Sequence, residues 1–475
     1  MKIDEKEAIK TVIDHYNETI NSTYRKKRVD DWEKWEKAYR GKRIPTDFPF
    51  PSCSNIDLGI IQIHTDAIAS RLKLAIIGAE PMFQMTSDTE NPEILKLKED
   101  AMTTLCKTNL TGQIGKAGIE PITDAIVHNL AVYGSCIAKN RWQTTTKYRK
   151  IFPKNPFLGA EPAIISEEKE RQRIDIIALE DFLIPDDITN IQEATYCIHR
   201  LYLSKSELKA RKKVYQNVEK VLDWLDKEKG EKTAVEKVVE KGEEFSTERV
   251  EVLEWYGQIE VDGEMQECIL TVAKDSEILL RKSLLIDVYW NNERPFHRFA
   301  LEDIGSFYGL GIPEKLGSNA EALNDIYNTS MNMGYYQMMG CGFYDKNANI
   351  DDEKFEISPG VLNPIDGDPN RAVMLIPYPA QAQIGQSFIG LLNNFIERKT
   401  AISAPSQGVE LPTKRTATEI KSLIDEGSIR HQDTIQSLRT DFGLFLKSIY
   451  ELYQLNIPDS LLLQISGGKL SGMFC

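Results

Sequence analysis

The stretch from residue 305 to 340, GSFYGLGIPEKLGSNAEALNDIYNTSMNMGYYQMMG, constrains the fold more than any other part of this sequence. A turn rich in glycine and aromatic residues leads into Ile312-Pro313, and no further proline follows in the stretch. Because proline in the first turn of a helix loses no hydrogen bond, the pattern predicts a long helix beginning near Pro313. Its polar positions are mostly amides: Asn319, Asn324, Asn328 and Asn332. A free surface helix would carry more charge and a core helix fewer amides, so we expect this helix to pack side by side against other polypeptide in an assembly.

A second segment of the same character lies at residues 379–402. It contains AQAQIGQSFIGLLNNFIERKT and again combines amides, including Gln383 and Gln386, with small and apolar residues. The insert between the two segments, residues 341–378, is rich in Pro, Gly and Asp and has short strand candidates at 355–362 and 372–377. The sequence therefore predicts two long helices of matched composition, separated by a small β-containing module.

The length and charge of the chain limit what these helices can belong to. At 475 residues the chain exceeds one simple domain, and because no apolar run approaches the length that spans a bilayer, we expect no membrane partner. The seven cysteines are scattered and form no C-x-x-C pair, which favours reduced thiols over a disulfide or zinc framework. A surface that holds nucleic-acid phosphates is usually basic, whereas this chain has a net charge of −14. If DNA is involved, we expect it to be guided rather than gripped.

The part of the chain before residue 305 mixes helical and strand patterns. Helical periodicity covers residues 5–40, where Trp32, Trp35 and Tyr39 form an aromatic stripe that we expect to face a partner surface. The elements expected after it are a helix from about Asn55 to Gly78, two helices within 93–142, strands within 173–187 and 194–204, and strands on both sides of a hairpin turn at Asp262-Gly263. The highly charged stretch 205–249 begins with many lysines, but acids interleave with them, so it favours a solvated helical face over a nucleic-acid patch. The sequence therefore predicts an α+β fold.

No pattern in the sequence points to catalysis. The nearest approach to a phosphate-binding loop is GQIGKAG at 112–118, but Leu110 stands where the first glycine of that loop belongs. Ala117 also follows Lys116, where the loop requires Ser or Thr. Adjacent acids such as Asp186-Asp187 are typical of solvated loops. We therefore expect neither an enzyme nor a bound metal or cofactor.

Five stretches occur in the same order as in one known family. They are SNIDLGIIQIHTDAIASRLKLAIIGAEPMF (54–83), NLAVYGSCIAKNRW (129–142), LEDFLIPDDITNIQEATYCIHRLYLS (179–204), SFYGLGIPEKLGSNAEALNDIYN (306–328) and PTKRTATEI (412–420). Through them the chain resembles the portal (head-to-tail connector) proteins of tailed bacteriophages, especially those of short-tailed phages. The resemblance covers most of residues 30–455.

The resemblance implies the phage portal fold, in which about a dozen copies close into a ring at one capsid vertex around an axial DNA channel. The parts it implies are a mixed α/β wing at 1–312, stem helices at 313–340 and 379–402, a clip at 341–378 between them, a tunnel loop at 403–414, and a helical wing return with a short crown at 415–475.

The resemblance also implies roles for particular residues. The amides of the two stem helices become contacts between neighbouring subunits, because amides allow close polar packing without unpaired charge. The candidates for contact with DNA in the channel are Arg398, Lys399, Gln407, Lys414 and Arg415. A purely structural interpretation stays open, since cations favour a helix C-terminus and Lys414 and Arg415 flank the capping box Thr416–Glu419. The acidic clip residues that we predict to dock partners are Asp351, Asp352, Glu353, Asp366 and Asp368.

A portal ring would conduct DNA during packaging and ejection and could nucleate capsid assembly. Its expected partners are further copies of this chain, double-stranded viral DNA, the large terminase subunit, head–tail adaptor and tail proteins, and the major capsid and scaffolding proteins. We expect assembly in the host cytoplasm and residence at the portal vertex of the virion. The alternatives are a packaging ATPase or nuclease, which would need the missing phosphate-binding loop, and a head-completion adaptor or minor capsid protein without a channel role.

Overall fold

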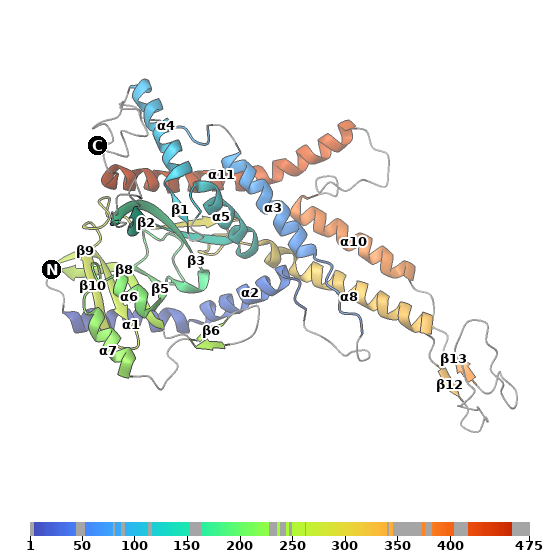
Figure 1. Ribbon diagram of the computed structural model, residues 1–475. Helices are drawn as coiled ribbons and strands as arrows, with labels where there is room; N and C mark the ends of the chain where they lie inside the picture. The colour runs from blue at the N-terminus through green and yellow to red at the C-terminus, as the bar shows by residue number, and fades with distance from the viewer. Residues whose placement is uncertain are drawn as a thin grey trace, which may run out of the picture.

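The computed structural model consists of a body of two β-sheets surrounded by helices, from which a pair of long helices projects (Figure 1). It describes residues 4–43, 53–78, 81–86, 91–112, 116–151, 163–227, 235–237, 244–246, 249–261, 263–339, 342–344, 373–375, 382–402 and 417–457. The expectation of an α+β fold is confirmed.

The helical pattern at the N-terminus is divided between two helices, α1 (Glu5–Asn21) and α2 (Thr23–Tyr39). Ser22 separates them, because its side chain accepts a hydrogen bond from the Arg25 amide and so caps the second helix. Each helix buries one face against a sheet of the same chain, α1 with Ala8, Val12 and Tyr16, and α2 with Trp32 and Trp35. The aromatic stripe predicted from the sequence thus packs inside its own subunit.

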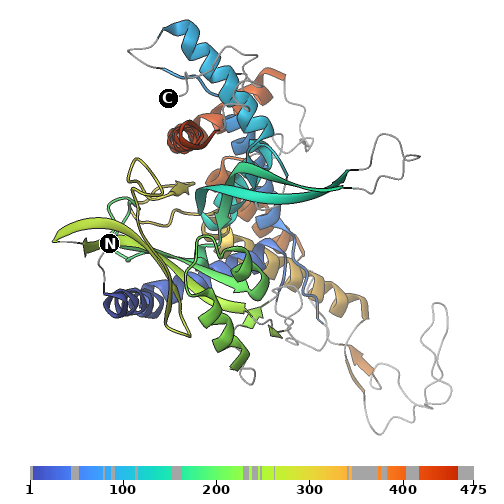
Figure 2. The same ribbon diagram turned by 60° about the vertical axis from the view of Figure 1, so that its left-hand side comes forward.

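The first sheet has four strands in the order β1-β3-β2-β11. Its centre is the long antiparallel pair β2 (Ser135–Ile151) and β3 (Ala163–Ile177), which extends as a two-stranded ribbon well beyond the body (Figure 2). The short β1 (Thr111–Gly112) runs parallel to β3, and β11 (Phe296–Ala300) pairs antiparallel with the first residues of β2.

The second sheet is antiparallel, with five strands in the order β10-β9-β8-β5-β4. Its strands are β4 (Phe182–Leu183), preceded by a short 3₁₀ turn at Leu179–Asp181, β5 (Tyr196–Ser204), β8 (Arg249–Val261), β9 (Glu264–Ala273) and β10 (Ile278–Leu284). The expected hairpin joins β8 to β9, and Gly263 there has a φ of +92°, a conformation that glycine adopts without steric cost. Side chains from both sheets share one apolar cluster, which includes Ile137, Phe182, Tyr256 and Phe296.

The charged stretch 205–249 is helical only in its first half. Helices α6 (Lys205–Ala210) and α7 (Val218–Lys227) are followed by the short antiparallel strands β6 (Val235–Lys237) and β7 (Glu244–Ser246). Val218, Val221, Leu222 and Leu225 are buried against the second sheet, which confirms a solvated helix with one apolar side, whereas Val214 lies exposed in the turn before α7.

The largest apolar cluster joins the first sheet to the remaining helices, α3 (Ile60–Ile77), α4 (Pro92–Thr108), α5 (Ile119–Tyr133), α8 (Ile312–Met339), α10 (Ala382–Thr400) and α11 (Ala417–Asn456). The last part of α11 crosses the body and buries Leu438, Phe445, Ile449 and Tyr453 in this cluster (Figure 1). The described residues of the 341–378 insert form one short ribbon, β12 (Gly342–Tyr344) paired with β13 (Val373–Leu375), at the far end of the projecting helices.

Candidate functional site on the helical arm

The projecting helices α8 and α10, here called the arm, are antiparallel and in close contact. Gly385 of α10 lies so near α8 that a Cβ atom there would be 2.7 Å from the Ser330 hydroxyl oxygen. At the other end, the Lys399 ammonium donates to the Asn319 side-chain oxygen at 2.8 Å and to the Lys315 carbonyl at 3.2 Å. Both long helices that the amide-rich segments predict are therefore present, and they pack along each other.

At the base of the arm, two backbone segments rich in glycine lie in close contact and attach the arm to the body. Gly134, at the turn between α5 and β2, has a φ of +77°, and a Cβ there would lie 2.3 Å from the Gly309 carbonyl oxygen. A Cβ on Gly311 would lie 2.5 Å from the Val132 carbonyl oxygen. The Ser135 hydroxyl accepts from the Gly309 amide at 2.7 Å, so the close approach is also held by hydrogen bonding. Only glycine allows two backbone segments to come this close.

Three asparagines of α8 hold an extended segment, residues 53–59, which we call the strap. The Asn332 side-chain oxygen accepts from the Ser54 amide at 2.8 Å, and that of Asn324 accepts from the Leu58 amide at 3.0 Å. Between them, Asn328 accepts from the Ile56 amide at 2.7 Å and donates to the Ile56 carbonyl at 2.8 Å. Successive amides spaced one helical turn apart thus bind alternate residues of an extended chain, much as a neighbouring β-strand would.

The strap changes the interpretation of these asparagines. The sequence assigned them to contacts between subunits, but each of the three is only 6% exposed and bonds the backbone of its own chain. Of the other stem amides, Asn319 bonds Lys399 within the arm, Gln386 is exposed, and Gln383 lies in α10 among residues whose side chains are not described. Gln386 alone among these described amides stays free for the predicted contact.

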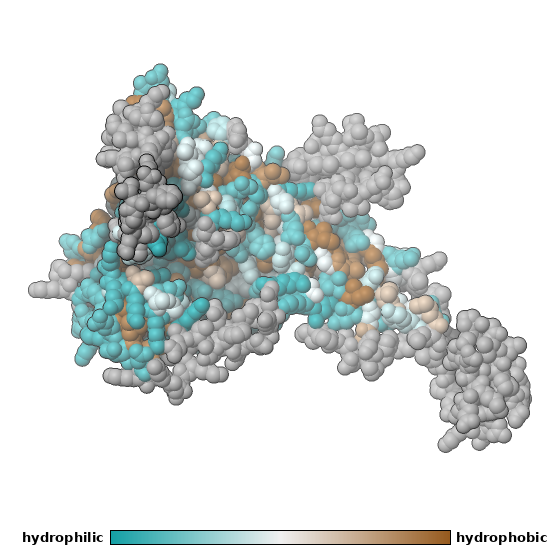
Figure 3. All heavy atoms as spheres, viewed as in Figure 1, coloured by the Kyte–Doolittle hydropathy of each residue, from teal (hydrophilic) through white to brown (hydrophobic). Residues whose placement is uncertain are grey.

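α10 instead exposes large apolar side chains. Phe388, Leu391 and Phe395 are 51%, 50% and 44% exposed and recur at intervals of three and four residues, so they form one stripe along the helix, here called the α10 stripe. Figure 3 shows hydrophobic residues gathered over the arm, where α10 lies in Figure 1. Such a stripe on a projecting helix marks a surface that another polypeptide covers.

The predicted channel and docking residues are only partly described. Arg398 and Lys399 lie in the last turn of α10 and are exposed, as the sequence predicts for cations at a helix C-terminus. Gln407, Lys414 and Arg415 lie outside the described residues, as do Asp351, Asp352, Glu353, Asp366 and Asp368 of the insert. Their roles stay predictions.

Where α10 ends, a buried histidine contacts it. His64 of α3 places Nδ1 3.1 Å from the Thr400 hydroxyl, and both side chains are buried. Burial lowers the pKa of His64, so the ring is neutral at physiological pH. His64 therefore packs inside the fold, against the end of α10.

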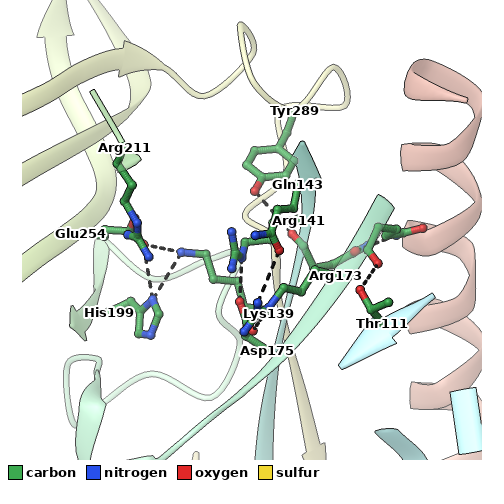
Figure 4. Close-up of polar contacts among 12 residues, drawn as sticks. Thr111, Lys139, Arg141, Gln143, Arg173, Asp175, His199, Arg211, Glu254 and Tyr289 are labelled. Carbon is green, nitrogen blue, oxygen red and sulfur yellow. Dashed lines mark hydrogen bonds and ion pairs between the residues drawn. The ribbon is translucent and has the colours of Figure 1, made fainter. Parts of the chain in front are cut away.

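A buried group of charges joins the two sheets of the body. Lys139 of β2 points toward Glu254 of β8 and His199 of β5 (Figure 4), and it forms an ion pair with Glu254. His199 Nδ1 lies 3.3 Å from both the Lys139 ammonium and the Glu254 carboxylate, and the Tyr215 hydroxyl donates to Glu254 at 3.3 Å. The three charged or titratable residues are at most 7% exposed.

The pKa shifts of this group follow from its burial. Burial alone would raise the pKa of Glu254, but Lys139 and His199 hold it well below its usual range. Burial lowers the pKa of Lys139, with Glu254 opposing the shift, and burial together with Lys139 lowers the pKa of His199. The group lies between the two sheets, and its members are paired with one another there.

The described residues contain neither a cluster of metal ligands nor a helix that could span a membrane. Within those residues no three His, Cys, Asp or Glu side chains come together as a metal would require. None of the described helices combines the length and the hydrophobicity needed to cross a bilayer.

The family comparison identifies the setting of the arm. The model of the phage SU10 portal protein family matches residues 84–435, well over half of the chain and a span that includes both arm helices. The chain belongs to the phage SU10 portal protein family. None of the curated proteins matches it. The match confirms the resemblance to phage portals, and in this portal-family chain the arm occupies the positions where the resemblance puts the stem.

Proposed function

We propose that this portal-family chain assembles into a closed ring at one vertex of the capsid, with the arm as the stem and residues 341–378 as the clip. The exposed α10 stripe carries the proposal, because a projecting helix with three large apolar residues on one side needs a partner surface. In a ring of identical subunits each copy offers one surface and receives another, and the rotation closes the assembly.

The axial channel of this ring would guide DNA. The polar side of α10 carries Gln386, Asn393 and Asn394, all exposed, and a single acid, Glu397. The basic pair Arg398-Lys399 follows in the last turn of the helix. Neutral amides do not neutralise phosphates, and each neutralised phosphate would add salt-dependent affinity that slows movement. The cations Arg398, Lys399, Lys414 and Arg415, together with the neutral amide of Gln407, would give transient contacts with DNA during packaging and ejection.

The clip supplies the docking surface for the other portal partners. Its acidic residues would face the large terminase subunit during packaging and the head–tail adaptors afterwards, through electrostatic complementarity. The wing faces the capsid shell, where major capsid and scaffolding proteins assemble around the ring. The role is structural, and the ring forms in the host cytoplasm before it becomes part of the virion.

Electron microscopy and native mass spectrometry of the purified protein test the proposal directly. Closed rings with a central opening are expected in the images, with one dominant multiple of 54.0 kDa in the mass spectrum. A monodisperse monomer across protein concentrations and ionic strengths would exclude the ring and leave a head-completion or minor capsid role.

A further inference from the structure

We propose that the strap of one copy is the surface that receives the α10 stripe of the next copy. The inference rests on the ring proposed above and specifies the two surfaces that meet at each subunit junction. Its basis is the placement of the strap relative to α10, the exposure of Ile56, and the charges at one end of both surfaces.

The strap and α10 lie on opposite sides of α8. Ser330 faces Gly385 and Asn319 faces Lys399, so these positions of α8 point toward α10. Asn328 is two residues from Ser330, which on a helix of 3.6 residues per turn puts it on nearly the opposite side. The strap therefore covers the side of α8 that faces away from α10, and the arm presents two different surfaces, as a heterologous ring contact requires.

The two surfaces also lie at the same height along the arm. The antiparallel pairs Ser330–Gly385 and Asn319–Lys399 set the register between the helices, so the level of Asn328 and Asn324 corresponds to the middle of α10. Asn328 holds Ile56, and the middle of α10 carries Phe388 and Leu391. When neighbouring arms stand side by side around an axis, Ile56 of one copy comes level with Phe388 and Leu391 of the next.

The asparagines prepare the strap to be covered. An extended segment normally exposes unpaired peptide groups, and burying such groups costs free energy. Here the amides of Ser54, Ile56 and Leu58 and the carbonyl of Ile56 are already bonded to α8. The Ile56 side chain, on a residue that is 44% exposed, then stands out from a peptide unit whose own amide and carbonyl are both bonded to Asn328.

The charges near the base of the arm agree with this pairing. Glu321 is exposed and lies about one helical turn before Asn324, on the strap side of α8. Asp325, one turn after Glu321, is also exposed, although Arg43 pairs with it. Arg398 lies about one turn after Phe395 on the α10 stripe. The stripe thus ends in a cation at the level where the strap side carries acids, so opposite charges meet when the apolar parts meet.

Charge variants at the two surfaces test the pairing, with Ile56→Lys on the strap and Leu391→Glu on the stripe. Each variant alone should lose rings, since it puts a charge against an apolar neighbour. The double variant should regain them, because each Lys then meets a Glu of the next copy. An equimolar mixture of the two single variants should also assemble, in alternating order, because every junction is then either the original apolar contact or a Lys–Glu contact.

The matched control is Asn393→Glu, on the polar side of α10, which should assemble as the unaltered chain does. Cross-linking gives a second measurement that needs no loss of assembly: Ile56→Cys with Leu391→Cys should form covalent multimers on oxidation, and Ile56→Cys with Asn393→Cys should not. Asn393 is two residues from Leu391 and so lies on the other side of α10.

The outcomes separate this inference from the proposed function. If the unaltered chain forms no rings, the portal ring itself is excluded. If it forms rings and both single charge variants do as well, the strap and stripe are not the junction. Loss of rings in the single variants without recovery in the double variant or the mixture, and without the Ile56–Leu391 cross-link, also overturns the pairing.

Discussion

The buried ion pair between Lys139 and Glu254 gives the sharpest test of how the body is held together. Removing one partner leaves the other charge enclosed, and breaking a buried pair in this way typically costs about 3–5 kcal/mol. Lys139→Met leaves Glu254 hydrogen-bonded to His199 and Tyr215, and neither supplies a positive charge at neutral pH because the pKa of His199 is lowered. The Arg211 guanidinium, which interacts with the Glu254 charge, compensates it only in part. We therefore expect a loss of about 3–5 kcal/mol for Lys139→Met, and a similar loss for Glu254→Leu.

The double variant Lys139→Met with Glu254→Leu shows whether an uncompensated charge causes the loss of stability in the single variants. Replacing both partners by apolar residues of similar size removes the uncompensated charge and is often neutral or stabilising, so the double variant should recover most of the lost stability. Thermal and urea unfolding of the four proteins, followed by circular dichroism at pH 7.5, complete a double-mutant cycle. Single losses below about 1 kcal/mol, or a double variant whose loss equals the sum of the singles, would refute the reasoning.

Gly134→Ala should lower the free energy of unfolding by at least about 2 kcal/mol, because it adds a Cβ at positive φ against the Gly309 carbonyl. Gly263→Ala is the control: it is also at positive φ but has no atom within 4 Å of the added Cβ, so its loss in a urea titration should be smaller. Burial lowers the pKa of His297 to about 4, so the unfolded chain binds a proton there more readily than the folded one. The free energy of unfolding should therefore fall as the pH drops from about 6.5 toward 4, by up to about 3 kcal/mol. His297→Phe should flatten the pH dependence of the melting temperature, and an unchanged slope would contradict this cause. Charge reversal of Lys399, Lys414 and Arg415, with Arg398 kept because it ends the α10 stripe, should leave rings visible by electron microscopy but reduce packaged DNA several-fold, whereas normal filling would remove these three residues from the channel.

Local chemistry made the elements of the arm predictable from the sequence. Pro313 marks the start of α8, and the amide-rich composition distinguishes both arm helices from core and free-surface helices. The capping role of Ser22, which divides the N-terminal helical pattern, was a local signal that periodicity alone did not resolve. In both places the decisive interaction lies within a few residues of the helix end.

The strap was not predictable in the same way. Its hydrogen bonds join positions 266 to 278 residues apart. The sequence prediction of a helix from about Asn55 was wrong for the strap residues, because the helix begins only at Ile60, and Ile56 and Leu58 before it bond to α8. The repeating asparagines were a correct signal that α8 packs polar groups against another segment, but a sequence cannot tell whether that segment belongs to the same chain or the next. The exposed α10 stripe depends on tertiary packing for the same reason, since only the position of α8 decides which apolar residues of α10 are covered.

The way α8 holds the strap has an evolutionary consequence. The asparagines bond peptide groups, which every non-proline residue supplies, so the attachment of the strap does not depend on which side chain stands at position 56. A substitution at position 56 can therefore alter what a neighbouring molecule meets without loosening the segment. In the proposed ring, a change at this one outward position would keep the strap anchored while ending co-assembly with related chains that lack the change.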